Sequence, residues 1–203
     1  MSALSRCRYN HPADAFRLGA MLKSAIIVLA MSGSKQLLEF QGKPLVRHAV
    51  EAACGSGCSP VVVVLGAWET EMRAALKGLR VEVVINRRWE EGAGTSIQAG
   101  LSALADCDVC GAIVASADQP FITAEYLRGL VTTHFESLKP IVASKYAGTA
   151  GVPAFFAEVI FPLLMALKPD QDCKDVILAH RADALLVECP EGGPVDHVRV
   201  ARG

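Results

Sequence analysis

Asp118 is the acidic residue best placed to hold a metal ion. It comes soon after the apolar run at residues 111–115, and Pro120 stops that run. A carboxylate beyond the carboxyl end of a buried strand faces the crevice in which open α/β sheets bind ligands. Mg²⁺ favours one or two carboxylates together with phosphate oxygens. The position predicts a Mg²⁺ ligand; the alternative is an aspartate that only caps the turn before the next helix.

Lys35 is a second candidate, because it follows another apolar run, at residues 25–30, in the stretch Gly33-Ser34-Lys35. Amides of small residues can cradle phosphate, and lysine adds a compact positive charge. The stretch matches neither GxGxxG nor the GxxxxGK[ST] loop. It predicts a phosphate contact, with an ordinary polar turn as the alternative.

A third group is formed by Gly92, Gly94 and Ser96, which precede a helix-period segment beginning at Ile97. Free backbone amides and a hydroxyl at the start of a helix can meet an anion. The alternative is that these residues simply cap the helix.

The elements that must position these residues alternate along the chain. Apolar, β-branched runs occupy residues 25–30, 60–65, 81–85, 111–115 and 140–143, and they do not alternate with polar residues. This is typical of parallel strands covered on both faces. Helix-period segments lie between them at 45–54, 68–77, 97–104 and 124–134, the last with Thr123 as its N-cap. The pattern predicts a doubly wound α/β fold, a mostly parallel sheet with helices on both faces.

The rhythm changes after residue 143. Residues 146–156 are glycine-rich and then apolar, and a helix at 162–167 and a short strand at 184–188 follow. We interpret this part as a substrate-side elaboration of one domain, since 203 residues fit one domain better than two. Residues 1–22 are polar, basic and aperiodic, which predicts a flexible N-terminal arm before a single domain at 23–203.

Composition excludes some classes of function. Lys plus Arg total 20 and Asp plus Glu total 21, for a net charge of −1, which argues against a nucleic-acid groove. The apolar run at 25–30 is far shorter than the ~20 residues of a membrane span, although it would also suit a signal peptide. Seven cysteines, an odd number, favour a reducing cytoplasm. The pairs Cys54/Cys58 and Cys107/Cys110 are free thiols or, less simply, zinc ligands.

Taken in order, these pieces resemble the MobA-like nucleotidyltransferases, and within them most closely the molybdenum cofactor cytidylyltransferases. The resemblance covers most of residues 24–190, and the Asp-Gln-Pro sequence after a strand is similar to the cytidylyl branch. The matching residues are the segments at 26–30, 34–38, 42–45, 100–101, 118–120 and 143–146, together with Asn86, Trp89, Gly92, Ser96, Gly148, Gly151, Pro153 and Phe156.

This resemblance implies a Rossmann-like nucleotidyltransferase fold and a set of roles. Lys35 would contact the NTP phosphates, Leu29 and Ala30 would touch base and ribose through backbone atoms, and Ser96 would lie near the nucleotide. The full set of nucleotide-binding candidates is Leu29, Ala30, Gly33, Lys35, Gly66, Gly92 and Ser96. The acceptor-binding candidates are Gln119, Pro120, Tyr146, Gly148, Gly151 and Pro153. Mg²⁺ would be held by Asp118 and Asp196, and Lys35 and Asp118 would be the catalytic residues.

The implied reaction is attack by the phosphate of a molybdopterin-type acceptor on the α-phosphate of CTP, with release of pyrophosphate. A molybdenum enzyme or its chaperone is the implied protein partner, with no nucleic acid and no membrane involved. The chain departs from the family at the loop after the first strand, where a glycine-rich stretch with an arginine is absent between Ala30 and Met31. It also keeps at most Asp196 of an Asp-rich closing segment, and 170–174 replaces a more glycine-rich stretch.

Two other functions compete with this one. A sugar-1-phosphate nucleotidyltransferase shares the fold and the chemistry, but its usual sugar-binding segments are not evident. A non-catalytic protein that holds a nucleotide or a maturing cofactor is favoured by the shortened first loop.

Overall fold

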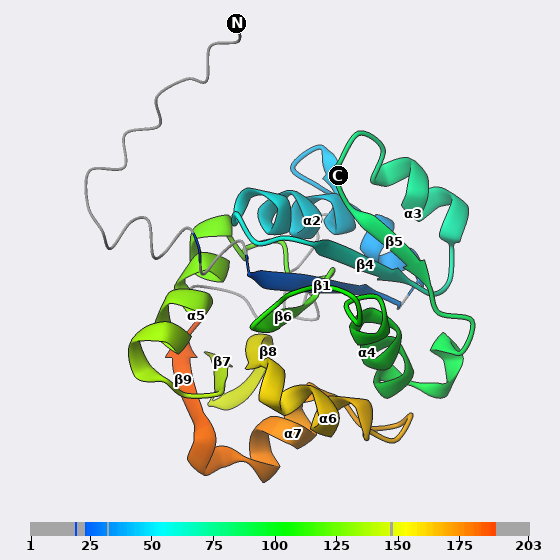
Figure 1. Cartoon of the computed structure of the whole chain (residues 1–203). Coiled ribbons are helices and arrows are strands. Elements are labelled where there is room, and N and C mark those ends of the chain that lie inside the picture. The colour runs from blue at the N-terminus through cyan, green and yellow to red at the C-terminus, as the bar shows by residue number, and fades with distance from the viewer. Residues whose placement is uncertain (1–18, 20–22, 32, 147, 190–203) are drawn as a thin grey trace, which may run out of the picture.

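A seven-stranded sheet forms the centre of the protein (Figure 1). The computed structural model describes residues 19, 23–31, 33–146 and 148–189. The strands are β1 (Ser24–Ala30), β4 (Val61–Leu65), β5 (Glu82–Ile85), β6 (Gly111–Ser116), β7 (Ile141–Tyr146), β8 (Thr149–Ala157) and β9 (Ala184–Glu188). Their order across the sheet is β5-β4-β1-β6-β8-β7-β9, and β2 (Glu39–Phe40) and β3 (Lys43–Pro44) form a separate ribbon.

The helices connect these strands. They are α2 (Leu45–Gly55), α3 (Glu69–Ala75), α4 (Ala93–Ser102), α5 (Ala124–Ser137), α6 (Phe161–Met165) and α7 (Cys173–Ala179). Short 3-10 turns occupy η1 (Gly33–Leu37), η2 (Trp89–Glu91), η3 (Glu158–Ile160) and η4 (Arg181–Asp183). Thr123 caps α5 as predicted, because its side chain accepts a hydrogen bond from the backbone N–H of Tyr126.

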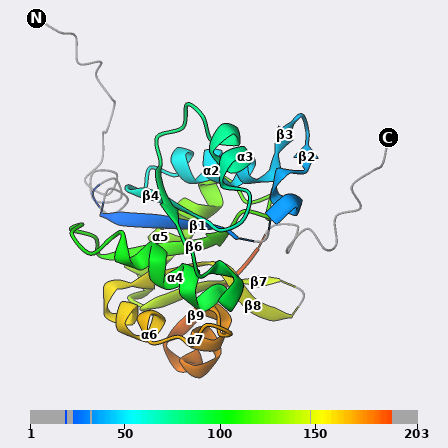
Figure 2. The same cartoon turned by 90° about the vertical axis from the view of Figure 1, so that its right-hand side faces the viewer.

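Both faces of the sheet are covered, which explains why β1 is apolar throughout. Successive β1 residues face opposite sides of the sheet. Ile26 and Ile27 are both fully buried, and each belongs to a different hydrophobic cluster. Helices α2, α3 and α5 pack on one face, and α4, α6 and α7 pack on the other. Figures 1 and 2 show these layers, with β1 between them. The predicted doubly wound α/β fold is confirmed.

The first four parallel strands set the place of the ligand crevice. Strand β1 pairs in parallel with β4 on one side and with β6 on the other, and β5 lies beyond β4. The chain moves outward from β1 to β5 and then returns past β1 to β6. This reversal makes the carboxyl ends of β1 and β6 a topological switch point, where open α/β sheets bind ligands.

Part of the region predicted as a substrate-side elaboration also extends the central sheet. Strand β8 lies between β6 and β7 and is antiparallel to both. A hairpin through Gly148, whose φ is +77°, forces the antiparallel direction. Phe155 and Phe156 bury completely, one on each face. Gly151 and Pro153 break the apolar pattern of the strand and hide it in the sequence.

Several predicted helix boundaries also change. Trp68 lies outside α3 and has a left-handed backbone with φ of 60°. Helix α4 begins at Ala93, so Gly94 and Ser96 lie inside it rather than ahead of it. Helix α7 has no counterpart among the predicted elements. The predicted N-terminal arm, residues 1–22, falls almost wholly outside the described residues, and so does the end of the predicted domain after residue 189.

Within the described part of the chain, no helix combines the length and the apolar character that crossing a membrane requires.

Candidate active site

A pocket of about 200 Å³ opens at the topological switch point. Leu29 and Met31 line it from the end of β1, and Ser116 lines it from the end of β6. The other walls come from α4 (Ala93 and Ile97), the β7–β8 hairpin (Tyr146, Gly151 and Val152) and the start of α7 (Asp172, Cys173 and Lys174). The pocket therefore joins three of the predicted site residues, Leu29, Tyr146 and Gly151.

Asp118 follows β6 beside this pocket, as the sequence predicts. One of its carboxylate oxygens, Oδ1, is buried and has no hydrogen-bond partner among the described residues. A carboxylate oxygen without a partner is costly to bury, and a cation beside it would offset that cost. Mg²⁺ bound through one protein carboxylate and substrate phosphates would satisfy it. The geometry fits a cation site at Asp118; Asp196, the second predicted ligand, lies outside the described residues.

Gln119 links the end of β6 to β8. Its side chain is 1% exposed, and its Nε2 donates a hydrogen bond of 2.9 Å to the carbonyl oxygen of Val152. Its Oε1 is buried without a partner among the described residues. Val152 lines the pocket. The side-chain amide of Gln119 therefore holds the β7–β8 hairpin in place next to Asp118. Gln119, a predicted acceptor residue, contacts the hairpin from behind and does not line the pocket itself.

Tyr146 lines the pocket, and its phenol is close enough to Asp118 for that charge to affect its pKa. Burial raises the pKa of its phenol, and the nearby Cys189, Asp118 and Asp172 raise that pKa further. The phenol is therefore neutral at physiological pH and retains its O–H donor. A Cβ at residue 151 would lie 2.3 Å from the phenol oxygen, so Gly151 gives Tyr146 its space. Of the other acceptor candidates, Gly148 is exposed in the hairpin turn, whereas Pro153 is buried.

The loop that carries Lys35 packs against Trp68, whose side chain is exposed. Lys35 is exposed on η1, and Gly33 is buried with a positive φ of 77°. A Cβ on Gly33 would lie 3.2 Å from Nε1 of Trp68, whose side chain is 51% exposed. Only glycine combines that backbone conformation with that contact at no steric cost. Trp68 therefore supports the loop, a role that no sequence pattern predicted.

Gly66, at the end of β4, has a packing role in this structure. A Cβ there would lie 2.6 Å from Cγ of Trp89, so the indole packs directly over the glycine. Its predicted contact to the nucleotide stays a prediction.

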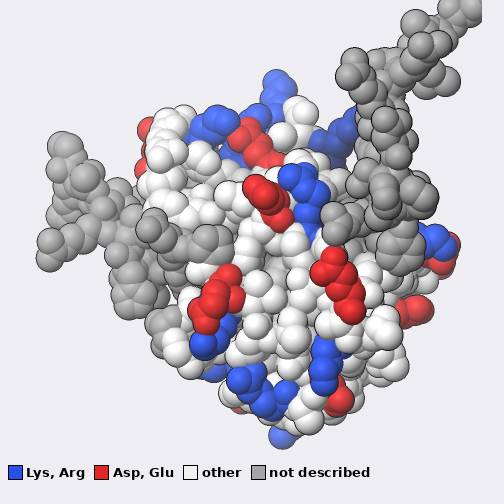
Figure 3. Space-filling model, turned by 90° about the vertical axis from the view of Figure 1, so that its left-hand side faces the viewer, with Lys and Arg blue, Asp and Glu red and all other residues white. Residues whose placement is uncertain are grey.

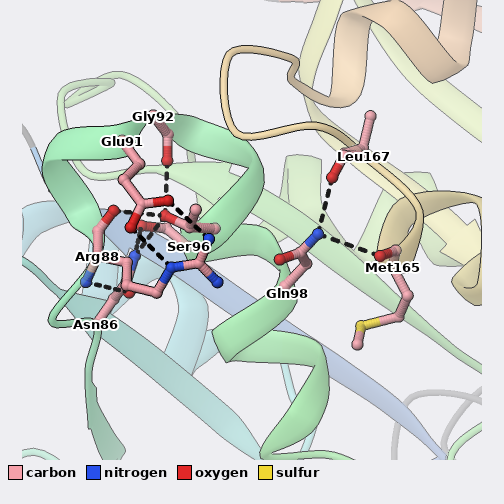
Figure 4. A network of polar contacts seen from close by, with 9 residues as sticks. Asn86, Arg88, Glu91, Gly92, Ser96, Gln98, Met165 and Leu167 are labelled. Atoms are coloured by element: carbon pink, nitrogen blue, oxygen red, sulfur yellow. Dashed lines mark hydrogen bonds and ion pairs between the residues drawn. The ribbon is translucent and has the colours of Figure 1, made fainter.

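Polar groups at the start of α4 form hydrogen bonds with other residues of the protein. Nδ2 of Asn86 donates to the hydroxyl oxygens of Thr95 at 2.8 Å and Ser96 at 2.7 Å, and Ser96 is 0% exposed. The N–H of Gly94 donates to the carbonyl oxygen of Pro169 at 3.1 Å. Figure 4 shows the hydrogen bonds around Asn86, Arg88 and Ser96. The amide of Gly94 thus has a partner within the protein, and the hydroxyl oxygen of Ser96 accepts from Asn86. Gly94 and Ser96 lie inside α4 and do not cap it with a side chain, and the predicted nucleotide contacts of Gly92 and Ser96 stay predictions.

We call residues 166–172, which connect α6 to α7, the α6–α7 connection. It is fastened along α4: Nε2 of Gln98 donates to the carbonyl oxygens of Met165 at 3.1 Å and Leu167 at 2.8 Å (Figure 4). The carbonyl of Lys168 passes so close to α4 that a Cβ on Gly94 would lie 2.2 Å from its oxygen. Glycine at 94 is thus required by a close approach of two backbones.

Replacing Gly94 with alanine is expected to destabilise the protein by about 1–3 kcal/mol, the usual cost of overpacking a filled site. The added methyl meets a backbone carbonyl, so the α6–α7 connection must shift. Urea unfolding followed by circular dichroism measures the free energy of unfolding.

Gly129→Ala is the matched control, since Gly129 is exposed in α5 and a Cβ there has nothing within 4 Å. Helix propensity predicts a gain of about 0.5–1 kcal/mol for this control. Equal effects of the two substitutions would refute the close approach at Gly94.

Three pocket residues, Asp172, Cys173 and Lys174, were absent from the predicted site. Asp172 caps α7, with its Oδ1 accepting from the N–H of Lys174 at 2.7 Å. The sequence does contain the corresponding signal, an aspartate followed three residues later by another aspartate that completes a capping box. The cap predicts a helix, but nothing local places that helix on the pocket.

The cysteines of the described residues are free thiols, and no group of three or more His, Cys, Asp or Glu side chains in that part of the chain is arranged to hold a metal ion. The zinc alternative for Cys54/Cys58 and Cys107/Cys110 thus gains no support. On the face shown in Figure 3, positive and negative side chains are interspersed rather than gathered by sign.

The doubly wound sheet, with a pocket and a carboxylate at its switch point, has the Rossmann-like architecture that nucleotidyltransferases share. Residues 28–184 match the MobA-like NTP transferase domain, and the chain belongs to this family.

Proteins that are similar to this chain in sequence have several different names. The chain is 29% identical over 170 residues to nicotine blue oxidoreductase of Paenarthrobacter nicotinovorans, covering 70% of this chain and 80% of that protein. It is 23% identical to purine catabolism protein PucB of Bacillus subtilis, covering 83% and 84%. A bifunctional protein GlmU from Corynebacterium aurimucosum is 32% identical over 123 residues, which cover 55% of this chain and 25% of that protein.

Solved structures agree on the fold. Rv0371c of Mycobacterium tuberculosis in complex with manganese superposes with a TM-score of 0.72 at 21% identity, covering 86% of this chain and 91% of that chain. A nucleotidyl transferase from Methanothermobacter superposes with a TM-score of 0.70 at 19% identity, covering 83% and 88%.

Proposed function

We propose that the protein transfers a nucleoside monophosphate, with CMP favoured, from an NTP to the phosphate of a molybdopterin-type acceptor. The observation that carries the proposal is the buried, unpartnered Oδ1 of Asp118 at the carboxyl end of β6. The acceptor's phosphate oxygen forms a bond to the α-phosphorus of CTP. The bond from that phosphorus to the β-phosphate's bridging oxygen breaks, and pyrophosphate leaves.

The chain's own residues would bind and orient the two substrates. Lys35 on η1 would contact the triphosphate, and the backbone of Leu29 and Ala30 at the end of β1 would border the base and ribose. Tyr146 would donate its O–H to the acceptor in the pocket, because its neutral phenol keeps that proton. Asp118 would hold Mg²⁺, which, when bound, offsets the negative charge that develops on the phosphates.

A second acceptor class deserves a parallel test. The likeness to GlmU, at 32% identity over 123 residues, favours a sugar 1-phosphate as the alternative acceptor. The chemistry at the α-phosphate would be the same, so only the acceptor distinguishes the two functions.

Pyrophosphate release, measured with CTP, GTP or ATP and Mg²⁺, decides between them. Each nucleotide is paired with molybdopterin or with a sugar 1-phosphate. The proposal expects the highest rate with CTP and molybdopterin. A preference for a sugar 1-phosphate would replace the acceptor. Nucleotide binding without release for any acceptor would favour a non-catalytic protein.

Lys35→Ala is expected to weaken CTP binding by about 1–3 kcal/mol, the scale of one charge-assisted contact. Titration calorimetry with CTP and Mg²⁺ measures this change. The control is Lys77→Ala, because Lys77 is also exposed but follows the C-terminal end of α3, outside the η1 segment that carries Lys35. The same CTP affinity in Lys35→Ala and in the parent would remove Lys35 from the triphosphate site.

A further inference from the structure

Lys174 is the one positively charged side chain among the described residues that line the switch-point pocket. It is exposed, and no hydrogen bond or ion pair of its ammonium group occurs within the described chain. Other lysines differ in this respect: Lys145, on β7, pairs with Glu188 at 2.5 Å. Among the described residues, the pocket therefore presents a cation that has no ion-pair partner.

Apart from Lys174 and the carboxylate of Asp172, the side chains that line the pocket are uncharged. Leu29, Met31, Ile97 and Val152 supply apolar surface, while Ser116 supplies a hydroxyl. The burial of Cys173 raises the pKa of its thiol, which keeps that group neutral. A ligand with an uncharged body and one anionic group would match such a lining, because the anion has a single cation to meet.

Asp172 supplies the carboxylate of the lining, and one of its two oxygens, Oδ1, is paired with the backbone. Its Oδ1 accepts from the N–H of Lys174 at 2.7 Å, and its own N–H donates to Oδ2 of Asp175 at 2.8 Å. These contacts hold the first turn of α7 in place. They also direct the Asp172 carboxylate to the backbone of residue 174 rather than to the ammonium of that residue.

The segment that carries Lys174 is anchored on the nucleotide side of the fold. Gln98 and the N–H of Gly94, both on α4, hold the α6–α7 connection through the carbonyls of Met165, Leu167 and Pro169. These contacts hold the connection that leads into α7 against α4, and so they set where the backbone of Lys174 begins the helix.

We infer that Lys174 binds the phosphate of the acceptor, an inference that rests on the proposed nucleotidyl transfer. Lys174 shares the pocket with Tyr146 and Gly151 of the β7–β8 hairpin, which belong to the predicted acceptor side. Lys35, the predicted contact of the triphosphate, projects from η1 beside α2 and does not line this pocket. The two lysines thus serve two different phosphate groups, and Lys174 selects acceptors that carry an anion.

The test compares Lys174→Gln and Lys174→Arg with Lys168→Gln. Lys168 is exposed on the same connection but does not line the pocket, so its substitution removes the same charge as a matched control. Rates of pyrophosphate release are measured against acceptor concentration at saturating CTP. Lys174→Gln is expected to raise the acceptor KM about 10- to 100-fold, the scale of one charge-assisted contact. The kcat and the CTP affinity stay unchanged, and Lys174→Arg restores most of the KM.

The inference is overturned if Lys174→Gln and Lys168→Gln have equal effects, or if Lys174→Gln weakens CTP instead of the acceptor. A binding experiment separates it from the proposed reaction. Inorganic phosphate is titrated into the ¹⁵N-labelled protein, and the amide signals of Tyr146 and Gly151 are followed. Shifts in the parent that disappear in Lys174→Gln support the anion site, even if no acceptor gives pyrophosphate release and the proposed reaction fails. Unchanged signals in the parent, or equal shifts in Lys174→Gln, refute the site.

Discussion

Asp118→Asn is expected to abolish metal-dependent pyrophosphate release while the fold remains intact. Asparagine keeps the shape of the side chain and removes its charge. The buried Oδ1 of Asp118 has no hydrogen-bond partner among the described residues, so we expect its charge to serve the metal ion rather than the fold. Loss of one preorganised electrostatic contact to a transition state lowers kcat by about 10²–10³-fold. Loss of the cation itself would lower it further, so we expect a fall of at least this size.

Steady-state rates at several Mg²⁺ concentrations, with thermal unfolding of the same samples, measure this effect. Asp108→Asn is the control: Asp108 precedes β6 as Asp118 follows it, and its side chain is 91% exposed in an ion pair with Lys23. Such surface pairs contribute about 0–1 kcal/mol, so the control should behave like the parent. Near-normal turnover by Asp118→Asn would eliminate Asp118 as the metal ligand.

Lengthening the first loop is expected to raise activity by about 100-fold or more. Only residues 31–34 lie between β1 and Lys35, and the family resemblance implies a longer, glycine-rich loop with an arginine there. Each charge-assisted hydrogen bond to phosphate contributes about 1.5–3 kcal/mol, so two added donors account for that factor. A glycine-rich stretch with one arginine, inserted between Ala30 and Met31, should therefore strengthen CTP binding and speed pyrophosphate release.

Two control insertions isolate the cause. The same stretch with serine in place of arginine separates the guanidinium from the added amides. The original stretch placed after Gly78, an exposed glycine in the turn between α3 and β5, tests for a general effect of insertion. If the parent already turns over CTP rapidly and the first-loop insertion changes nothing, the triphosphate is bound without that loop.

The sequence by itself determined the central layers of this protein. Runs such as the one within β1 are apolar throughout because both faces of the sheet are covered, and that pattern is local enough to read along the chain. It also determined where Asp118 lies, because the residue after a buried parallel strand must reach the carboxyl edge of the sheet. Thr123 as the cap of α5 follows from equally local chemistry.

The tertiary structure decided which distant residues contact the sheet edge and the start of α4. Gly94 was open to two interpretations from the sequence, and a carbonyl of Pro169, 75 residues away along the chain, accepts its amide hydrogen. Strand β8 enters the sheet against β6, and α7 brings Lys174 to the pocket, through pairings that no local pattern encodes. Such contacts depend on how separate segments pack, because a hydrogen-bond donor or a cation acquires its partner only when the chain is folded.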